Sequence, residues 1–325
     1  MKKYNWGMIG TGWIAHEMAD ALNTVNDKVY AVADVNEEML KKFATEKHIK
    51  KTYTDPDKMI ADPNIDIIYI ATPHTFHYEY IKKALNAGKH VFCEKAITVN
   101  ARQFDEVEKL AKEKGLILTE GFTLYHMPIY KKVTDLIKAG KLGQIKMIQV
   151  NFGSLKDYDP KNRFFNKDLA GGALLDIDDY ATAFARTFLD ESPESILTTV
   201  KFFETGVDEQ SGIIMKNTKD QMVVMALSMR AKQPKSGTKG YVEINHYPRA
   251  TEADITYTAS AHEEKHDKIT AGDSDKALEY KVQDMQRYID QGHDDGQLQM
   301  SHDIAHILTS VRTSWGMKYP FDDEK

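Results

Sequence analysis

The chain has 325 residues, a hydrophobic share of 42%, a charged share of 28% and a formal net charge of −6. This length favours two domains, and the acidic balance argues against nucleic acid or an anionic membrane as the main partner. The sequence shows no signal peptide, no apolar stretch of membrane-spanning length and only one cysteine, Cys93. We therefore expect a cytoplasmic protein without internal disulfides.

The first residues predict a dinucleotide-binding turn. An apolar run over residues 6–9 stops at Gly10, and a helical pattern begins after Gly12. Gly10 permits a tight turn, Gly12 lets a pyrophosphate approach the backbone, and the small Ala15 lets the helix lie against the strand. The expected cofactor contacts in this turn are Gly10, Thr11, Gly12, Trp13 and Ile14.

The next strand, residues 29–33, ends in Asp34, close to the spacing expected of a ribose-binding acid. An aspartate there accepts both ribose hydroxyls of NAD and repels a 2′-phosphate. Neither Val35 nor Asn36 supplies a cation for that phosphate. The pattern predicts NAD, with NADP possible, and the alternative is an ordinary strand–helix–strand unit with glycines in its turn.

Strands and helices alternate as far as residue 120, which predicts a doubly wound parallel sheet in a domain of residues 1–121. Ligands bind at the carboxyl edge of such a sheet. A lysine at that edge, Lys95, can stabilise the alkoxide that forms as hydride leaves, although a solvated surface lysine explains it equally well. The residues expected to contact the cofactor at this rim are Thr72, Pro73, His77, Glu94 and Lys95.

Beyond residue 121 the pattern changes to short strands joined by polar turns. Strands are expected over 145–154, 196–203, 211–216, 221–230, 240–245 and 255–258. They predict a second α+β domain, residues 122–325, built on a large, mostly antiparallel open sheet. Two helices, 275–291 and 297–315, close the chain, and the tail from 297 is a candidate to pack back onto the first domain.

A glycine-containing stretch interrupts this domain and leads into a helix. Gly171 and Gly172 would let the chain pass close to a ligand. Asp176 and Tyr180 are four residues apart, so they would share one helical face. A lysine ammonium nearby would favour the phenolate, which makes Lys95, Asp176 and Tyr180 a candidate proton-handling group. The alternative is an aspartate that interacts with the helix dipole and a tyrosine that packs.

Metal binding is not expected. The run from His262 to His266 fits the zinc-protease pattern His-Glu-x-x-His, which requires a helix in a cleft and a third protein ligand. Residues 258–275 are polar and lack an apolar helical face, so a solvated connection is expected there. His302 and His306 lie on the final helix, where packing and surface roles explain them.

Several motifs together resemble the glucose–fructose oxidoreductase / inositol dehydrogenase / MocA (Gfo/Idh/MocA) family along nearly the whole chain. They are the glycine turn at 10–15, Pro73-x-x-x-His77, the run 87–95, the segment 171–180 and the tail 312–320. Three positions depart from the family pattern. Ala96 replaces a proline, Asp178 a common glycine and Tyr125 an arginine seen in many relatives.

The resemblance implies a Rossmann domain followed by a domain whose open sheet forms a homodimer or homotetramer. It implies NAD(P)-dependent oxidation of a secondary alcohol of a sugar, polyol or cyclic trans-diol. Lys95 would polarise the reacting oxygen with Asp176 as partner, and Tyr180 would exchange the hydroxyl proton. Tyr125 and Arg163 would contact substrate, and His77 substrate or ribose. A non-catalytic NAD-binding regulator and a reductase of linear imine or bilin-like substrates remain alternatives.

Overall fold

The computed structural model describes residues 3–25, 27–154, 158–230, 241–260 and 263–322. The chain divides into two compact units. The first contains residues 1–121 together with 275–302, and the second contains residues 122–274 together with 303–325.

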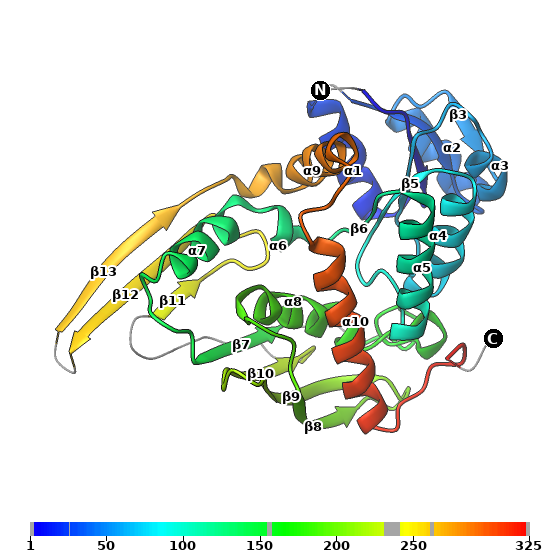
Figure 1. The fold of residues 1–325 in the computed structure, drawn as a ribbon. Helices are drawn as coiled ribbons and strands as arrows, with labels where there is room; N and C mark the ends of the chain where they lie inside the picture. The colour runs from blue at the N-terminus through cyan, green and yellow to red at the C-terminus, as the bar shows by residue number, and fades with distance from the viewer. Residues whose placement is uncertain (1–2, 26, 155–157, 231–240, 261–262, 323–325) are drawn as a thin grey trace. The chain divides into compact units, whose positions relative to one another are not determined.

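A six-stranded parallel sheet forms the centre of the first unit, as predicted from the alternating strands and helices (Figure 1). β1 and β4 are buried along their whole length, because helices cover both faces of the sheet. In spatial order the strands are β3 (Lys51–Tyr53), β2 (Val29–Ala33), β1 (Trp6–Ile9), β4 (Ile67–Ile70), β5 (His90–Cys93) and β6 (Leu118–Glu120).

The helices of this sheet lie in the connections between successive strands. They begin and end at ordinary capping residues: the Asn36 side chain accepts the N–H groups of Glu38 and Met39, and Gly115 ends α5 with a left-handed φ of 61°. The helices are α1 (Trp13–Thr24), α2 (Glu37–Glu46), α3 (Pro56–Ile60), α4 (His77–Asn86) and α5 (Ala101–Lys114), with a 3-10 turn η1 (His74–Phe76) before α4.

A helix from the end of the chain, α9 (Ala277–Gln291), completes the first unit by packing against α1. Its attachment is polar as well as apolar. The Tyr4 hydroxyl donates to Asp290 at 2.6 Å, and the Gln286 amide donates to Asp27. Asp27 also accepts the indole N–H of Trp6 at 3.3 Å. These side-chain bonds fix α9 to the start of β1 and to the end of the β1–α1–β2 connection.

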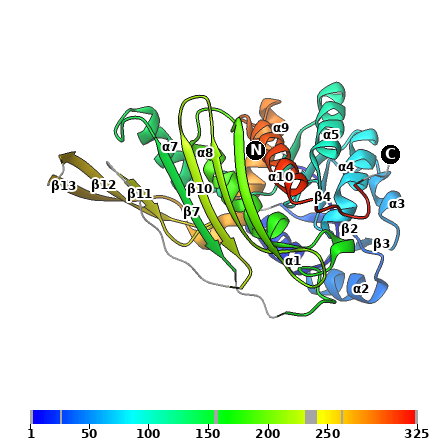
Figure 2. The ribbon, with the colours of Figure 1, turned by 90° about the horizontal axis from the view of Figure 1, so that it is seen from below.

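The second unit is built on a four-stranded sheet with one apolar face covered by α8 (Figure 2). Its strands are antiparallel except for the parallel pair β7 and β10, so the mostly antiparallel sheet predicted from the sequence is confirmed. In order they are β7 (Met147–Gly153), β10 (Met222–Ser228), β9 (Asp208–Lys216) and β8 (Ser195–Phe202). The helices of this unit are α6 (Thr123–His126), α7 (Pro128–Lys138) and α8 (Asp179–Phe188), with short turns η2 (Lys167–Leu169) and η3 (Leu174–Asp178). The last helix, α10 (Gln297–Ser314), begins in the first unit and belongs to the second from residue 303.

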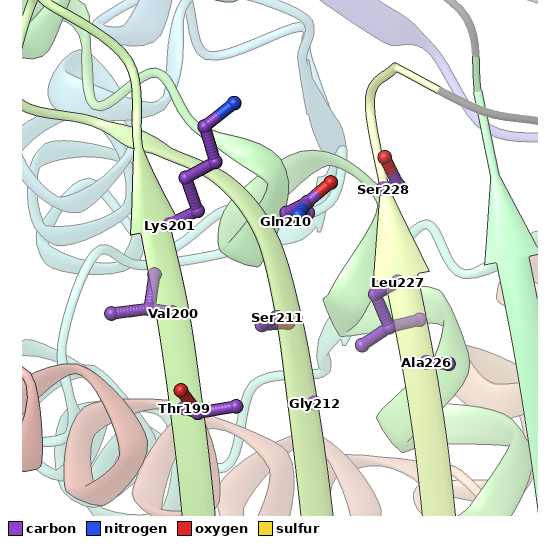
Figure 3. A pocket seen from close by; sticks show the side chains of 9 residues that line it. All are labelled: Thr199, Val200, Lys201, Gln210, Ser211, Gly212, Ala226, Leu227 and Ser228. Atoms are coloured by element: carbon purple, nitrogen blue, oxygen red, sulfur yellow. The ribbon is translucent and has the colours of Figure 1, made fainter.

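The opposite face of this sheet is open. Burial alternates along β9 and β10, which leaves Ile214 and Val224 side by side on the open face with Leu197 of β8 next to Ile214. A hollow of about 350 Å³ lies on the same sheet, with Lys201, Gln210 and Ser228 gathered toward one end (Figure 3).

A separate three-stranded antiparallel sheet follows, made of β11 (Tyr241–Ile244), β12 (Glu252–Ser260) and β13 (Glu263–Thr270). The solvated connection expected over 258–275 is wrong for β13, which pairs along its length with β12. The sequence does not predict this strand, because almost every side chain in it is polar and no alternation of apolar and polar residues is present. His262 lies outside the described residues, and His266 is in a strand, where it contacts the Thr256 hydroxyl at 2.9 Å. The helix that the zinc-protease pattern requires is therefore not formed at His266.

Among the helices that the structure describes, none combines the length and the apolar character needed to cross a bilayer.

Candidate active site

The glycine turn between β1 and α1 has the geometry of a dinucleotide cradle. Gly10 has a φ of +98°, and a Cβ there would lie 2.5 Å from the carbonyl oxygen of Ala71, so only glycine fits. Gly12 begins α1 without a side-chain cap, and a Cβ there would meet no atom within 4 Å. Open space over uncapped helix N–H groups fits a pyrophosphate. Trp13 is 65% exposed at the same turn.

Asp34 follows β2 and is held in place by two donors. Its Oδ2 accepts the Thr11 hydroxyl at 2.6 Å, and its Oδ1 accepts the Asn36 N–H at 2.9 Å. The carboxylate is thus fixed beside the glycine turn, where a ribose would be recognised. The turn and Asp34 together fit a nicotinamide dinucleotide.

Thr72 and Pro73 follow β4 at the same sheet edge. The Thr72 Oγ1 is buried and has no hydrogen-bond partner among the residues that the structure describes. A buried hydroxyl without a partner is costly, so it fits a site that a polar ligand completes.

His77 fastens the loop after β4 to the loop after β5. Its side chain is fully buried, with Nδ1 2.9 Å from the Ala96 carbonyl oxygen and Nε2 2.8 Å from the Thr72 carbonyl oxygen. Both ring nitrogens therefore lie within hydrogen-bond distance of a backbone carbonyl oxygen. The structure thus assigns His77 a role in fixing the rim, and its expected contact with ribose or substrate stays a prediction.

Lys95 lies in a segment, residues 94–97, in which every residue accepts a hydrogen bond from, or donates one to, a side chain elsewhere in the first unit. The His74 Nε2 donates to the Lys95 carbonyl at 3.1 Å, and the Ile97 N–H donates to the buried Glu120 carboxylate at 2.8 Å. The peptide between Lys95 and Ala96 is cis. The lysine is half-buried at the carboxyl end of β5, as the sequence predicts.

The first of these residues, Glu94, is part of a buried ion pair. Its Oε1 accepts the Tyr69 hydroxyl at 2.8 Å and lies 3.1 Å from the ammonium of Lys281, whose side chain is only 1% exposed. Burial, and then the charge of Glu94, raises the pKa of Tyr69 well above its ordinary value, so this phenol stays a donor. A Cβ at Gly121 would lie 2.9 Å from the same oxygen, which explains the glycine. The expected cofactor contact of Glu94 remains a prediction.

Lys281 is not among the site residues predicted from the sequence. The helical pattern of the sequence could have indicated that this lysine is buried. Lys281 lies on one stripe of α9, at i, i+3, i+4, i+7 spacing with Leu278, Val282 and Met285, and all four side chains are buried. A lysine on a buried stripe requires a buried acceptor, and Glu94 supplies it.

In the second unit, the glycines before the candidate substrate helix serve the protein's own packing. A Cβ at Gly171 would lie 2.6 Å from the Arg163 carbonyl oxygen, and one at Gly172 would lie 2.1 Å from Asp208 Oδ1. The close approach expected here is therefore made to the chain itself. Gly172 also has a φ of +114°, which favours glycine.

The turn after these glycines is a π-helix, η3, which continues into α8. Short π-helical turns are frequent at functional sites. Asp176 lies in this turn with a side chain 11% exposed, and its Oδ1 is 3.8 Å from the guanidinium of Arg163. Arg163 also lies over the ring of Phe164, 4.2 Å from its centroid. The structure thus brings together two of the predicted substrate residues.

Tyr180, at the start of α8, lies among aromatic rings. Its ring centroid is 5.5 Å from that of Phe122 and 6.0 Å from that of Tyr247, in edge-to-face geometry. Tyr125 contacts the same Phe122 at 5.2 Å. The two predicted tyrosines therefore share one aromatic neighbour.

Comparison with known proteins identifies the family. Residues 4–122 match the family described as oxidoreductases with an NAD-binding Rossmann fold, and residues 130–246 match the Gfo/Idh/MocA C-terminal domain. The chain belongs to the Gfo/Idh/MocA family. The resemblance inferred from the motifs is confirmed, and the protein is an NAD(P)-dependent oxidoreductase of the dehydrogenase type.

Its relatives within the family include enzymes acting on diols and sugars. A trans-1,2-dihydrobenzene-1,2-diol dehydrogenase from Xenopus laevis is 34% identical over 247 residues, 74% of each chain. A D-xylose 1-dehydrogenase (NADP(+)) from Hypocrea jecorina is 32% identical over 256 residues, 70% of this chain and 65% of the relative.

Solved structures share the fold of this Gfo/Idh/MocA protein. A 3-ketoreductase from Actinomadura kijaniata, solved with NADP and TDP-benzene, has a TM-score of 0.84 at 22% identity and covers 96% of this chain and 98% of its own. A levoglucosan dehydrogenase solved with NADH has a TM-score of 0.86 at 20% identity, with 97% of both chains covered.

Removing the Lys281 charge should destabilise the first unit. Lys281→Met leaves the Glu94 carboxylate buried without its cation, and breaking a buried pair in this way costs about 3–5 kcal/mol. Urea unfolding at neutral pH measures the loss.

The double variant Lys281→Met/Glu94→Gln removes both charges and should recover a large part of that stability. A Lys281→Met protein as stable as the unmodified chain would show that the pair does not hold the segment before Lys95.

Proposed function

We propose that this dehydrogenase oxidises a secondary alcohol on a ring-shaped sugar, polyol or cyclic trans-diol, and reduces the corresponding ketone. The observation that carries the proposal is the position of Lys95 at the carboxyl edge of the sheet, on a backbone that hydrogen bonds hold in place. Bonds to the Glu94 side chain and to the backbone of residues 95–97 fix this segment, and a lysine on it suits a reaction in which negative charge develops on an oxygen.

The chemistry divides among the chain's own residues. Lys95 donates a hydrogen bond to the reacting oxygen and stabilises the alkoxide, and Tyr180 exchanges the hydroxyl proton. Asp176 and Arg163, 3.8 Å apart, offer an acceptor and a set of donors to neighbouring hydroxyls. When bound, the nicotinamide supplies the acceptor or donor of hydride.

A ring substrate with adjacent hydroxyls fits the side chains around Tyr180. The rings of Phe122 and Tyr247 contact Tyr180 edge-to-face and hold its phenol in place, while Asp176 and Arg163 suit the hydroxyls of a ring substrate. Among relatives, the Xenopus laevis protein is named for a cyclic trans-diol and the Hypocrea jecorina protein for xylose. Both names describe vicinal hydroxyls on a ring.

NAD is the preferred cofactor in this proposal. Asp34 is anchored by Thr11 and by the Asn36 N–H, so its carboxylate cannot easily turn away from a 2′-phosphate. The fixed negative charge would repel that phosphate and accept the ribose hydroxyls of NAD.

The protein acts as a homodimer or homotetramer assembled through the open face of the four-stranded sheet. Leu197 is 71% exposed and Ile214 is 43% exposed, and these two residues pair across β8 and β9. Met147 and Met222 form a second exposed pair across β7 and β10. A second copy presenting the same strands would cover this apolar surface, and self-complementary contacts of this kind form two-fold dimers.

Replacing the reacting side chains should abolish turnover but leave cofactor binding intact. Lys95→Ala and Tyr180→Phe should each lower kcat/KM by about 10²–10⁴-fold, because each removes a group that acts in the transition state. NADH formation across sugars, inositols and trans-diols measures activity, and quenching of protein fluorescence measures NADH affinity. Lys58→Ala, at an exposed lysine of α3, is the matched control. Unchanged turnover in the two variants would refute the assignment, and NADH binding without turnover on any alcohol would favour a regulator.

Asp34→Ser should relax cofactor discrimination, since it removes the charge that opposes a 2′-phosphate. The ratio of kcat/KM for NAD to that for NADP should fall. Equal use of NAD and NADP by the unmodified enzyme would contradict the role given to Asp34.

Placing a charge on the open face should dissociate the oligomer. Ile214→Glu should give monomers in sedimentation velocity experiments, because the carboxylate would be buried against an apolar partner surface. Lys219→Glu, in the turn after β9, should leave the oligomer intact. A monomeric unmodified protein would rule out this interface.

A further inference from the structure

Residues 317–322 form a tail after α10 and are the last residues that the structure describes. Part of this tail belongs to a motif that resembles the family pattern, but the reaction proposed above gives it no role. Tyr319, in the middle of the tail, is only 2% exposed. Its hydroxyl donates to the Gly171 carbonyl oxygen at 2.9 Å. The tail is therefore bonded to the glycine segment that precedes η3.

Arg312, Phe321 and Asp322 hold Tyr319 in this position. The guanidinium carbon of the buried Arg312 lies 4.5 Å from the centroid of the Tyr319 ring. Asp322 accepts the Tyr319 N–H at 2.7 Å and the Arg312 guanidinium at 2.9 Å. The Phe321 ring stacks with the Tyr319 ring at a centroid distance of 5.5 Å. A cation, a carboxylate and a second ring thus fix the phenol.

The Tyr319 phenol keeps its proton. Burial, and next the charge of Asp208, raises the pKa of this phenol well above its ordinary value. The hydroxyl therefore remains a donor, and the Gly171 carbonyl oxygen is the acceptor that it uses.

The carbonyl group that Tyr319 binds belongs to the peptide between Gly171 and Gly172, which joins two candidate substrate residues. Both glycine N–H groups donate to carbonyl oxygens of the loop that contains Arg163, at 2.9 Å each. In the other direction the chain continues into η3, which contains Asp176. The position of this one peptide therefore affects both Arg163 and Asp176.

Two successive glycines have unusual backbone freedom, so bonds from elsewhere in the unit matter for the conformation of this peptide. Asp208 supplies one such bond on the side of η3, where it accepts the Leu174 N–H at 2.7 Å. Tyr319 supplies another at the carbonyl between the glycines. Without the Tyr319 bond the peptide would be free to rotate, and the 3.8 Å separation of Arg163 and Asp176 would no longer be fixed.

We propose that the C-terminal tail positions Arg163 and Asp176 for the substrate through the hydrogen bond from Tyr319 to Gly171. Tyr319 is a positioning residue, since it acts through the backbone of the glycine segment. This inference rests on the proposed roles of Arg163 and Asp176 in binding the alcohol. Lys95 belongs to the first unit, and the tail does not hold it. The tail should therefore affect the binding of alcohol rather than the binding of NAD.

Tyr319→Phe removes the hydrogen bond and keeps the buried ring. The KM for alcohol should rise about three- to tenfold, the factor that corresponds to one lost hydrogen bond. The kcat and the KM for NAD should not change, because Lys95, Tyr180 and the glycine turn are intact. Tyr4→Phe is the matched control, since it removes a phenol hydrogen bond of 2.6 Å to Asp290 in the first unit.

Hydrogen exchange followed by mass spectrometry tests the anchor and needs no substrate. In Tyr319→Phe, the backbone amides of residues 171–176 should exchange faster than in the unmodified protein. Those of β8, in the same unit, should exchange at the unmodified rate. Tyr4→Phe should leave the exchange of residues 171–176 unchanged.

The outcomes separate the anchor, its effect on substrate and the proposed function. Unchanged exchange of residues 171–176 in Tyr319→Phe would overturn the anchor. An unchanged KM for alcohol in Tyr319→Phe, or an equal rise in Tyr4→Phe, would overturn the positioning role. A protein that oxidises no alcohol but shows the faster exchange would refute the proposed function and support the anchor.

Discussion

The buried pair between Glu94 and Lys281 is the interaction on which the first unit's chemistry depends. A lysine that acts on a reacting oxygen must remain charged, and its ammonium group must stay close to that oxygen although the side chain is long and flexible. The structure fixes the backbone that carries Lys95 through the residues on either side of it. Glu94 is anchored in the interior, His74 and His77 bind the next two carbonyls, and Glu120 binds the N–H of Ile97.

In the second unit, too, a buried carboxylate holds the backbone beside a candidate site residue. One of its candidate substrate residues, Asp176, lies on a π-helical turn that another strand supports. Asp208 supplies this support from β9 through the Leu174 N–H, and the glycine at 172 leaves room for that carboxylate. In both units, a buried acidic residue holds the backbone next to a candidate site residue.

The sequence predicted those features that depend on local pattern. Gly10, Gly12 and Asp34 belong to one strand–helix–strand unit, so spacing alone predicts their place around the turn between β1 and α1. The polar strand β13 was missed because its hydrophobic period is absent. The sequence also could not predict that α9 belongs to the first unit. An apolar stripe on a helix indicates that this face is buried, but it does not indicate which element the helix packs against. Other features arise from contacts between residues that are distant in sequence, and no rule based on local spacing predicts them. These features are the ion pair of Lys281, the π-helical turn and the two hydrogen bonds of the His77 ring.

The arrangement also explains why departures from the family pattern need not change the reaction. Ala96 lies where the resemblance leads us to expect proline, and the segment around it is held by the side chains of His74, His77 and Glu120. Asp178 lies where the resemblance leads us to expect glycine, but its carboxyl group is buried and accepts a hydrogen bond from the Ser211 hydroxyl.

The most direct test of this account is a crystal structure of the enzyme with NADH and an unreactive analogue of the alcohol substrate. The account predicts the Lys95 Nζ within hydrogen-bond distance, about 3 Å, of the analogue's reacting oxygen. A reacting oxygen held by other donors, with the Lys95 side chain turned away from it, would contradict the account.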